Sequence, residues 1–506
     1  MPRSLLSILL VVTVMITLGV LAYPPQETLI YSDSYETLII AKRLGQNQAL
    51  DLPFGERGMA WEPLFYNRIN HAAVIAAVSA ALRLPLTQSS ALINLGAYLA
   101  TGLGMYFLAL AIFKKTRLAL LAALLVAVSP SILFWKSYLV GDPLAIALLV
   151  WSLLAAVSYY HKKSSAVLIA LITLIALTIA IRLEYVAALP AIYLLLRTHL
   201  STRASLESSA QILLLAALPY AISLHYISDL TALAGFSRVL IGNWSRYLLV
   251  PLALMALITL AALNAQQRLK QQLPTIAMIT YALAFLASRD WASPLAQLQY
   301  FTSWLTLEFG VITAALGYLI IKFKWSKETV INRALLTLLA GFSLVYFDFY
   351  FQHAAVLTIP LTLIALISLT TLINKLKPQK QSLALIIIGF GYTLYSLTLT
   401  HFITFPKFDF QQVEAAHLKM IITTPWSVVY TGFPQALYYL NNYHARYLEN
   451  SLAASPQETS TYVVMDRKTQ VTPKPTWEKV TSFAMPKETL IDEEGLPVVT
   501  VYKVSK

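Results

Sequence analysis

Three acidic side chains stand beside apolar runs, where a reaction at a membrane surface could use them. Asp33 and Glu36 lie in the segment Tyr-Ser-Asp-Ser-Tyr-Glu, and Asp142 precedes Pro143 in Gly-Asp-Pro-Leu. A positioned carboxylate can take the proton of an acceptor group as a general base. Helix capping explains the same residues, since Asp33 or Ser32 followed by Glu36 matches a capping box, and an acid before proline matches an N-cap. The sequence leaves both interpretations open.

One arginine lies inside an apolar stretch. Arg182 occurs in Ala-Ile-Arg-Leu-Glu-Tyr, and ionisable groups at membrane depth are costly and usually face a cavity or a partner. Arg182 is therefore a candidate for binding a phosphate, and an ion pair with Glu184 or Asp348 is the structural alternative. The other cations that could hold a phosphate are Arg57, Arg289 and His353, followed by Arg68.

The composition of the chain indicates a membrane protein. Of the 506 residues, 58% are hydrophobic and 12% are charged, whereas soluble proteins carry about 25% charged residues. The chain is therefore expected to be a polytopic membrane protein, and about thirteen apolar runs are long enough to cross roughly 30 Å of hydrocarbon. These runs are residues 5–23, 91–113, 118–135, 143–160, 166–181, 183–196, 209–227, 247–263, 274–288, 304–321, 334–351, 354–373 and 383–402. The absence of cysteine excludes disulfides and thiol catalysis.

The apolar segment 66–84 is predicted to lie in the membrane interface rather than to cross. With that assignment, the short basic loops all share the side of Arg3, as the positive-inside rule requires. Those loops contain Lys114, Lys115, Arg117, Lys162, Lys163, Arg197, Arg203, Arg268, Lys270, Lys322, Lys324, Lys327, Arg333, Lys375, Lys377 and Lys380. The N-terminus is then cytoplasmic, and Asp33 and Asp142 share the outer face. Arg68, His71 and Arg83 suit an interfacial helix better than a buried one.

Two further outer parts position the candidate residues. The first outer loop, residues 24–90, is acidic, and its residues 31–44 are predicted to form an amphipathic helix on the outer surface. The tail, residues 404–506, carries ten basic and ten acidic residues, so no basic surface for nucleic acid is present. Helices at 411–422 and 434–450 and strands at 427–431, 462–465 and 498–504 are predicted there.

The predicted fold class is thus an all-α polytopic membrane domain over residues 1–403 and a small extracytoplasmic α/β domain over residues 404–506. The tail is expected to shape acceptor access without chemistry of its own. Tyrosines of the segment 434–450 are expected to pack on strands rather than to stack on sugars.

The order of these motifs resembles the GT-C superfamily of polyprenyl-phosphate-dependent glycosyltransferases, and within it the protein O-mannosyltransferases and the aminoarabinose transferases of lipid A. The matching residues are Asp33 in the first outer loop, Ser129-Pro130 and Asp142 in the second, and Arg182 at the break after the fifth span. The resemblance covers roughly residues 1–200. Two features depart from the family, since Glu62 stands where a basic residue often precedes Pro63, and the first loop lacks Asp-x-Asp.

The resemblance implies an inverting glycosyltransferase in the plasma (inner) membrane. Its donor would be a polyprenyl-phosphate sugar and its acceptor a glycan, a lipid or a protein. Asp33 would be the general base, with Asp142 orienting the acceptor or supporting the base and Glu36 as a further catalytic candidate. Arg182, Arg57, Arg289 or His353 would stabilise the departing phosphate. The missing Asp-x-Asp favours a metal-independent reaction, although a divalent metal is left open. No cofactor is expected. Membrane lipids are expected as binding partners, and nucleic acid is not.

Two other classes compete with this interpretation. A transporter or flippase for a lipid-linked substrate commonly has paired halves with polar residues at the bilayer midplane. No such duplication is evident here, and the polar residues crowd the predicted outer face. A membrane scaffold whose tail binds a partner would leave the acidic first loop unexplained.

Overall fold

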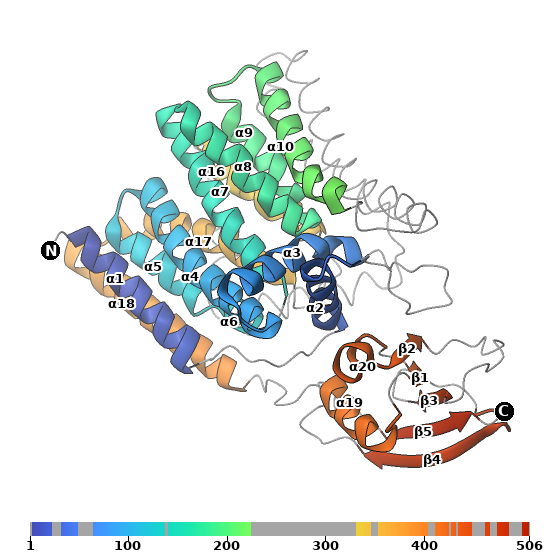
Figure 1. Cartoon of the computed structure of the whole chain (residues 1–506). Coiled ribbons are helices and arrows are strands. Elements are labelled where there is room, and N and C mark those ends of the chain that lie inside the picture. The colour runs from blue at the N-terminus through green and yellow to red at the C-terminus, as the bar shows by residue number, and fades with distance from the viewer. Residues whose placement is uncertain are drawn as a thin grey trace.

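The computed structural model describes residues 3–22, 32–48, 64–136, 140–223, 330–345, 353–402, 410–424, 427–431, 434–447, 461–465, 473–484 and 498–504. Figure 1 shows a helical body and a separate small sheet that ends at the C-terminus. This arrangement confirms the predicted class of a mostly helical chain with a C-terminal α/β part.

The helical body contains the following elements: α1 (Arg3–Ile16) with a π-helical turn (Thr17–Ala22), α2 (Ser32–Gly45), α3 (Leu64–Leu82), α4 (Leu86–Phe113), α5 (Thr116–Ala127), α6 (Pro130–Lys136), α7 (Asp142–Lys162), α8 (Ser165–Ile181), η2 (Leu183–Ala188), α9 (Leu189–Leu196), α10 (Thr202–Ser223), α16 (Val330–Val345), η6 (His353–Leu357), α17 (Thr358–Ile373) and α18 (Pro378–Phe402).

Several of these helices are apolar enough to lie in a membrane. In the part of the chain that the structure describes, α4, α7 and α18 are long enough to cross, and α5 with α6 forms a bent fourth candidate. Shorter apolar helices include α8 and α17. The chain is thus an integral membrane protein, while the count of about thirteen spans stays a prediction. Its runs at 247–263, 274–288 and 304–321 lie outside the described residues.

The Ser-Pro motif marks the bend between α5 and α6, whose axes differ by 56°. Ser129 Oγ accepts a hydrogen bond of 3.3 Å from the backbone N–H of Ile132, and Pro130 opens α6. A serine before a proline in the first helical position is a common helix start. At this bend the Tyr98 hydroxyl donates a hydrogen bond to Ala127 O at 2.7 Å. This bond takes the place of the backbone N–H that the carbonyl would accept from in a continuous helix.

A second break follows α8. Arg182 is in an extended conformation (φ −143°, ψ 108°), and the chain continues as η2 and α9. Ala180 O accepts hydrogen bonds from Asn70 Nδ2 at 2.6 Å and from the Tyr220 hydroxyl at 2.9 Å. The break expected at Arg182 after the fifth span is therefore present.

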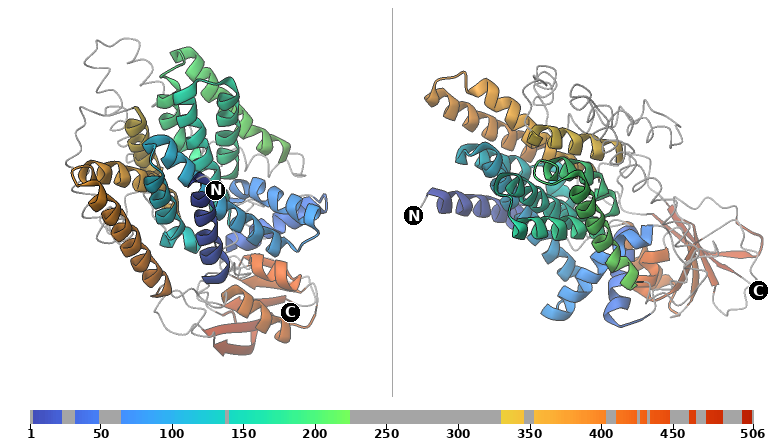
Figure 2. Two further views of the ribbon diagram at one scale, coloured as in Figure 1. Left: turned by 90° about the vertical axis from the view of Figure 1, so that its left-hand side faces the viewer. Right: turned by 90° about the horizontal axis from the view of Figure 1, so that it is seen from above.

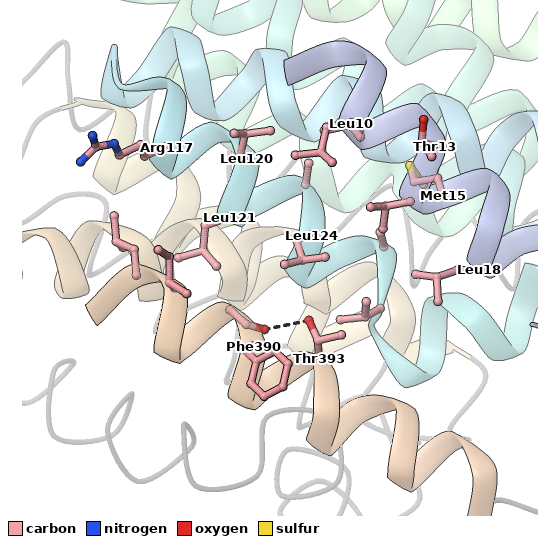
Figure 3. Close-up of a pocket in the computed structure, with 18 of the residues that line it drawn as sticks. Leu10, Thr13, Met15, Leu18, Arg117, Leu120, Leu121, Leu124, Phe390 and Thr393 are labelled. Carbon is pink, nitrogen blue, oxygen red and sulfur yellow. Dashed lines mark hydrogen bonds between the residues drawn. The ribbon is translucent and has the colours of Figure 1, made fainter. Parts of the chain in front are cut away.

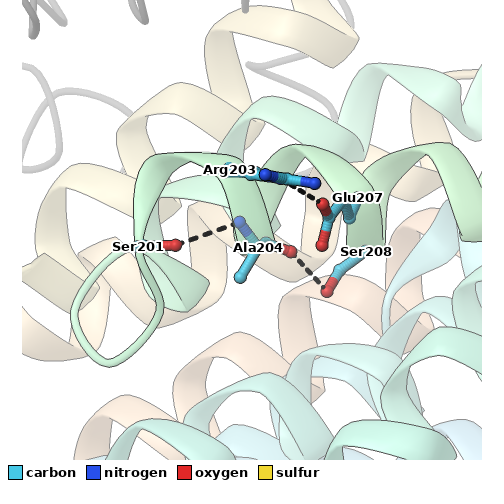
Figure 4. Close-up of polar contacts among 5 residues, drawn as sticks. All are labelled: Ser201, Arg203, Ala204, Glu207 and Ser208. Carbon is cyan, nitrogen blue, oxygen red and sulfur yellow. Dashed lines mark hydrogen bonds and ion pairs between the residues drawn. The ribbon is translucent and has the colours of Figure 1, made fainter.

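Helix α10 begins at the end of the bundle opposite to the break at Arg182, and side chains stabilise its first turn (Figure 4). Ser201 Oγ accepts from the Ala204 N–H at 3.2 Å, and Arg203 Nε contacts Glu207 Oε1 at 2.7 Å. The latter pair is exposed and joins residues one turn apart, an arrangement that contributes little stability.

Helices α2 and α3 lie between the helical body and the C-terminal domain, as Figures 1 and 2 show. They pack on each other, and α3 also contacts α4, α8 and α10. The predicted helix at 31–44 is confirmed as α2, whose Tyr35 and Leu38 are fully buried. The expectation that the polar residues of α3 lie at the surface is wrong for Arg68 and His71, which are buried, because α2 and the turn before α7 cover them.

The C-terminal domain contains a five-stranded sheet in the order β2-β1-β3-β5-β4. Strands β1, β2 and β3 are mutually parallel, and β5 is antiparallel to β3 and β4. Its elements are α19 (Phe410–Ile421), β1 (Val428–Thr431), α20 (Pro434–Asn441), β2 (His444–Tyr447), β3 (Thr461–Met465), β4 (Trp477–Ala484) and β5 (Val498–Val504).

One predicted helix of this domain is wrong in its length. The helix predicted over 434–450 ends at Asn441, because Asn442 adopts a left-handed conformation (φ 56°) and the chain continues into β2. Asparagine at this position commonly terminates a helix. The strand β4 was not predicted, whereas the helix at 411–422 and the strands at 427–431, 462–465 and 498–504 are confirmed within a residue or two.

Helix α20 docks the C-terminal domain onto α2. The rings of Tyr439 and Tyr35 lie 6.2 Å apart, and Arg43 Nη2 donates to the Tyr438 hydroxyl at 3.0 Å. Ala436 joins Tyr35 and Leu38 in a common apolar cluster. These two tyrosines therefore contact helix α2, whereas the sequence predicted that they pack on strands.

The interfacial assignment of α3 can be tested with cysteines, since the chain has none of its own. Gln46 and Gln88 flank α3 and are exposed, and Lys162 is exposed at the end of α7. In intact cells we expect an impermeant maleimide to label Gln46→Cys and Gln88→Cys but not Lys162→Cys. Labelling of Gln46→Cys without Gln88→Cys would mean that α3 crosses the membrane.

Candidate active site

The structure describes some of the predicted site residues and not others. The side chains of Glu36, Arg68, Asp142, Arg182 and Glu184 are described. Asp33 is the second residue of α2, and His353 opens η6, but their side chains lie outside the described set. Arg57, Arg289 and Asp348 also lie outside the described residues. Because Asp33 precedes Glu36 by three residues, the two stand on the same face of α2.

An ion pair joins the two predicted residues Asp142 and Arg182. Arg182 Nη2 lies 2.8 Å from Asp142 Oδ1, and the side chains are only 12% and 8% exposed. The sequence did not predict this partnership. The expectation that Asp142 is an N-cap is wrong, since Gly141 occupies that position and Asp142 is the first residue of α7. The carboxylate still benefits from the positive end of the α7 dipole.

A second buried ion pair connects α2 with α3. Arg68 Nη1 contacts Glu36 Oε2, and both side chains are almost fully buried. Removing one member of a buried pair costs about 3–5 kcal/mol, because the other charge is left uncompensated. This pair therefore fixes α2, with Asp33 one turn away, against α3.

His71 lies one turn after Arg68 and reaches the turn before α7. A Cβ at Gly141 would lie 3.3 Å from His71 Cγ, so a larger residue there would require the ring to shift by a few tenths of an ångström. Nε2 of His71 is buried and has no hydrogen-bond partner among the described residues. Burial lowers the pKa of His71 to about 4, although the nearby carboxylate of Asp142 opposes this shift. The imidazole is therefore neutral at pH 7.

Further polar groups surround the break at Arg182. Asn70 and Tyr220 hold the carbonyl of Ala180. Glu184 acts electrostatically on Tyr220, and one of its carboxylate oxygens, Oε2, is buried without a hydrogen-bond partner among the described residues. The sequence analysis missed Asn70, Tyr220 and the role of His71. The run Arg-Ile-Asn-His within the apolar segment 66–84 was the signal that could have found two of them.

Lys136 is another buried cation that the sequence analysis missed. Its Nζ donates to Gly19 O at 2.9 Å and lies 5.8 Å from the ring centre of Tyr98. The side chain is 1% exposed. Lys136 therefore ties α6 to the end of the first helical segment and to α4.

This arrangement combines features that proton transfer requires. The guanidinium of Arg182 lies 2.8 Å from the carboxylate of Asp142. Nε2 of the neutral His71 imidazole, which has no partner among the described residues, can donate or accept a hydrogen bond, depending on its tautomer. The site thus offers carboxyl groups and a neutral imidazole around the beginnings of α2 and α7.

We expect Asp142 and Arg182 to depend on each other energetically. A double-mutant cycle of Asp142→Asn and Arg182→Gln should give a coupling energy of about 1–3 kcal/mol in thermal unfolding of the detergent-purified protein. The matched control is Arg203–Glu207, whose side chains are 90% and 57% exposed, and whose coupling should be about 0.3–0.5 kcal/mol. Equal coupling in both cycles would contradict a stabilising role for the buried pair.

We also expect acid to destabilise the protein through His71. The unfolded chain binds a proton near pH 6.5, whereas the folded chain does so only near pH 4, so stability falls as the pH drops from 6.5 towards 4. At pH 5 this loss is about 2 kcal/mol. The melting temperature of His71→Gln should consequently fall less between pH 7 and pH 5 than that of the wild type. Identical pH profiles would show that His71 is not held neutral.

Comparisons with known proteins place this fold. No family model matches the sequence, and no curated protein matches it. Among solved structures, the Archaeoglobus fulgidus oligosaccharyltransferase in complex with zinc and sulfate superimposes with a TM-score of 0.52 at 12% identity, over 87% of this chain and 62% of the other. The same enzyme tethered to an acceptor peptide gives a TM-score of 0.56 at 10% identity, over 91% and 69%.

A bacterial enzyme matches over nearly the full length of both chains. ArnT from Cupriavidus metallidurans bound to undecaprenyl phosphate superimposes with a TM-score of 0.51 at 11% identity, over 98% of this chain and 97% of the other. The chain spans about 62% of the length of the first oligosaccharyltransferase structure. The chain therefore has the fold of these structures, in agreement with the resemblance of its motifs to the GT-C superfamily.

Proposed function

We propose that the protein is a membrane glycosyltransferase that moves a sugar from a polyprenyl-phosphate donor to an acceptor at the extracytoplasmic face. The observation that carries the proposal is the position of α3. Through Arg68 it holds α2, and one turn later His71 packs against the turn that starts α7. The acidic beginnings of α2 and α7 therefore lie at the same end of the helical body.

Asp33 is the proposed general base, and transfer proceeds with inversion at the sugar. A phosphate leaving group departs without a general acid, so the reaction requires a base for the acceptor and positive charge for the phosphate. Glu36 is engaged with Arg68, and we assign it to positioning α2 rather than to proton transfer. Asp142, held by Arg182, orients the acceptor.

Arg182 is the proposed contact for the donor phosphate. Its guanidinium lies beside Asp142 at the buried break after α8, and the planar fork of a guanidinium suits the geometry of a phosphate. Arg57, Arg289 and His353 remain further candidates for the same anion.

The structural neighbours support a lipid-linked donor and a separate acceptor. ArnT was crystallised with undecaprenyl phosphate, and the oligosaccharyltransferase with a tethered acceptor peptide. For this chain the acceptor class is a glycan, a lipid or a protein. The protein is proposed to lie in the plasma membrane with its N-terminus in the cytoplasm, and to act without a metal, since the first loop lacks Asp-x-Asp.

The proposed base can be tested in a deletion strain that is complemented with single variants. We expect Asp33→Asn to lower transfer by about 10²- to 10⁴-fold, measured by mass spectrometry of envelope glycans, glycolipids and glycoproteins. Asp51→Asn, an acid of the same outer loop, is the matched control and should retain activity.

Two outcomes would contradict the proposal. Near wild-type glycosylation by Asp33→Asn with a stability loss of about 1 kcal/mol would mean that Asp33 only caps α2. If the deletion strain accumulated the lipid-linked sugar in the cytoplasmic leaflet, and Asp33→Asn restored its transfer across the membrane, the protein would be a flippase.

A further inference from the structure

An apolar groove runs along the outside of the helical body, far from the site described above. Helix α5 forms its floor, and α1 and α18 form its walls, as Figure 3 shows. Its volume is about 780 Å³. The residues of α18 that line it share one face of the helix and are Ser382, Leu385, Ile386, Gly389, Phe390 and Thr393.

The groove has the length of one membrane leaflet. Its floor extends from Arg117 to Val128, which corresponds to about 16 Å at 1.5 Å per helical residue. The hydrocarbon core of a bilayer is about 30 Å thick. The groove can therefore accommodate an acyl chain of a single leaflet.

A polar pocket of about 590 Å³ continues the groove at one end. The two share Arg117, Ser382 and Leu385, and the pocket adds Lys115, Asn374 and Gln381 among others. This end is formed by the beginnings of α5 and α18 and by the end of α17. It lies at the ends of the helices opposite to Asp142, on the side that the positive-inside rule predicts to be cytoplasmic.

The pocket has the electrostatics of an anion site. Arg117 and Lys115 are exposed, and among the described residues they contact neutral groups. Arg117 donates to the hydroxyl of Ser382, and Lys115 Nζ donates to the amide oxygen of Asn374 at 3.3 Å. Among the described residues that line the pocket or the groove, none is acidic. The beginning of α5 also presents backbone N–H groups that lack helical partners, and such groups favour an anion.

We propose that this continuous surface binds an anionic glycerophospholipid of the inner leaflet. The phosphate headgroup occupies the pocket beside Arg117 and Lys115, and an acyl chain occupies the groove between α1 and α18. A cationic pocket joined to a leaflet-length apolar groove matches both parts of such a lipid. The bound lipid bridges the first and the last helix of the membrane part across α5. This inference is independent of the proposed glycosyl transfer.

Lipid binding can be measured on the delipidated, detergent-purified full chain by native mass spectrometry and thermal unfolding. We expect phosphatidylglycerol to be retained and to raise the melting temperature more than phosphatidylcholine with the same acyl chains. Each basic residue near an anionic membrane surface strengthens binding by about fivefold. Lys115→Gln with Arg117→Gln should therefore lower phosphatidylglycerol affinity about 30-fold. Equal retention of both lipids would overturn the proposal.

Two further variants separate the headgroup pocket from the groove and from general charge. Lys162→Gln with Lys163→Gln removes two exposed cations from another loop and should leave phosphatidylglycerol binding unchanged. Gly389→Leu places a side chain against Leu121 in the groove and should weaken binding of the lipid but not of inorganic phosphate.

Three results would contradict the assignment. Inorganic phosphate that raises the melting temperature as much as phosphatidylglycerol would show an anion site without an acyl-chain groove. Loss of lipid in the Lys162 and Lys163 variant equal to that in the Lys115 and Arg117 variant would show a general charge effect. A lipid-free dimer in the mass spectrum would indicate that a second copy of the chain covers the groove.

Discussion

The contact between Asp142 and Arg182 is the constraint on which the arrangement of the membrane part depends. Both charges are almost fully buried, and a buried charge is tolerated only with a partner. The pair therefore requires the start of α7 and the end of α8 to meet at one level. The turn at Gly141 then lies where His71 of α3 packs against it, so the position of α3 follows from the same requirement.

Helix α3 connects the Asp142–Arg182 pair with the first outer loop and, through α2, with the C-terminal domain. Arg68 fixes Glu36 and with it α2, and α2 in turn packs against Tyr439 and Tyr438 of α20. A chain of direct contacts thus connects the ion pair at the membrane with a domain more than 200 residues later in the sequence. In the part of the chain that the structure describes, the C-terminal domain contacts α2 through α20.

The sequence predicted the features that local patterns determine. The break at Arg182, the helix α2 and most strands of the tail follow from charge, helical spacing and alternation. The partners of the charges were not predictable in the same way, because Asp142 and Arg182 are 40 residues apart and Arg68 and Glu36 are 32 apart. Ion pairing between distant residues is a tertiary property that no local pattern encodes. His71 was considered only as a surface residue for the same reason, since nothing near it in sequence indicates that Gly141 covers it.

The hydrogen bonds at the two breaks have a consequence for motion. At the bend after α5, Tyr98 and Ser396 supply hydroxyls to the carbonyls of Ala127 and Val128. At the break after α8, Asn70 and Tyr220 do the same for Ala180. Bending the chain at either break would leave a backbone carbonyl without a hydrogen bond inside the membrane, where no water can replace it, and this costs several kcal/mol. Both breaks are therefore expected to behave as fixed corners rather than hinges, so that bending of the helical body would occur at other points of the chain.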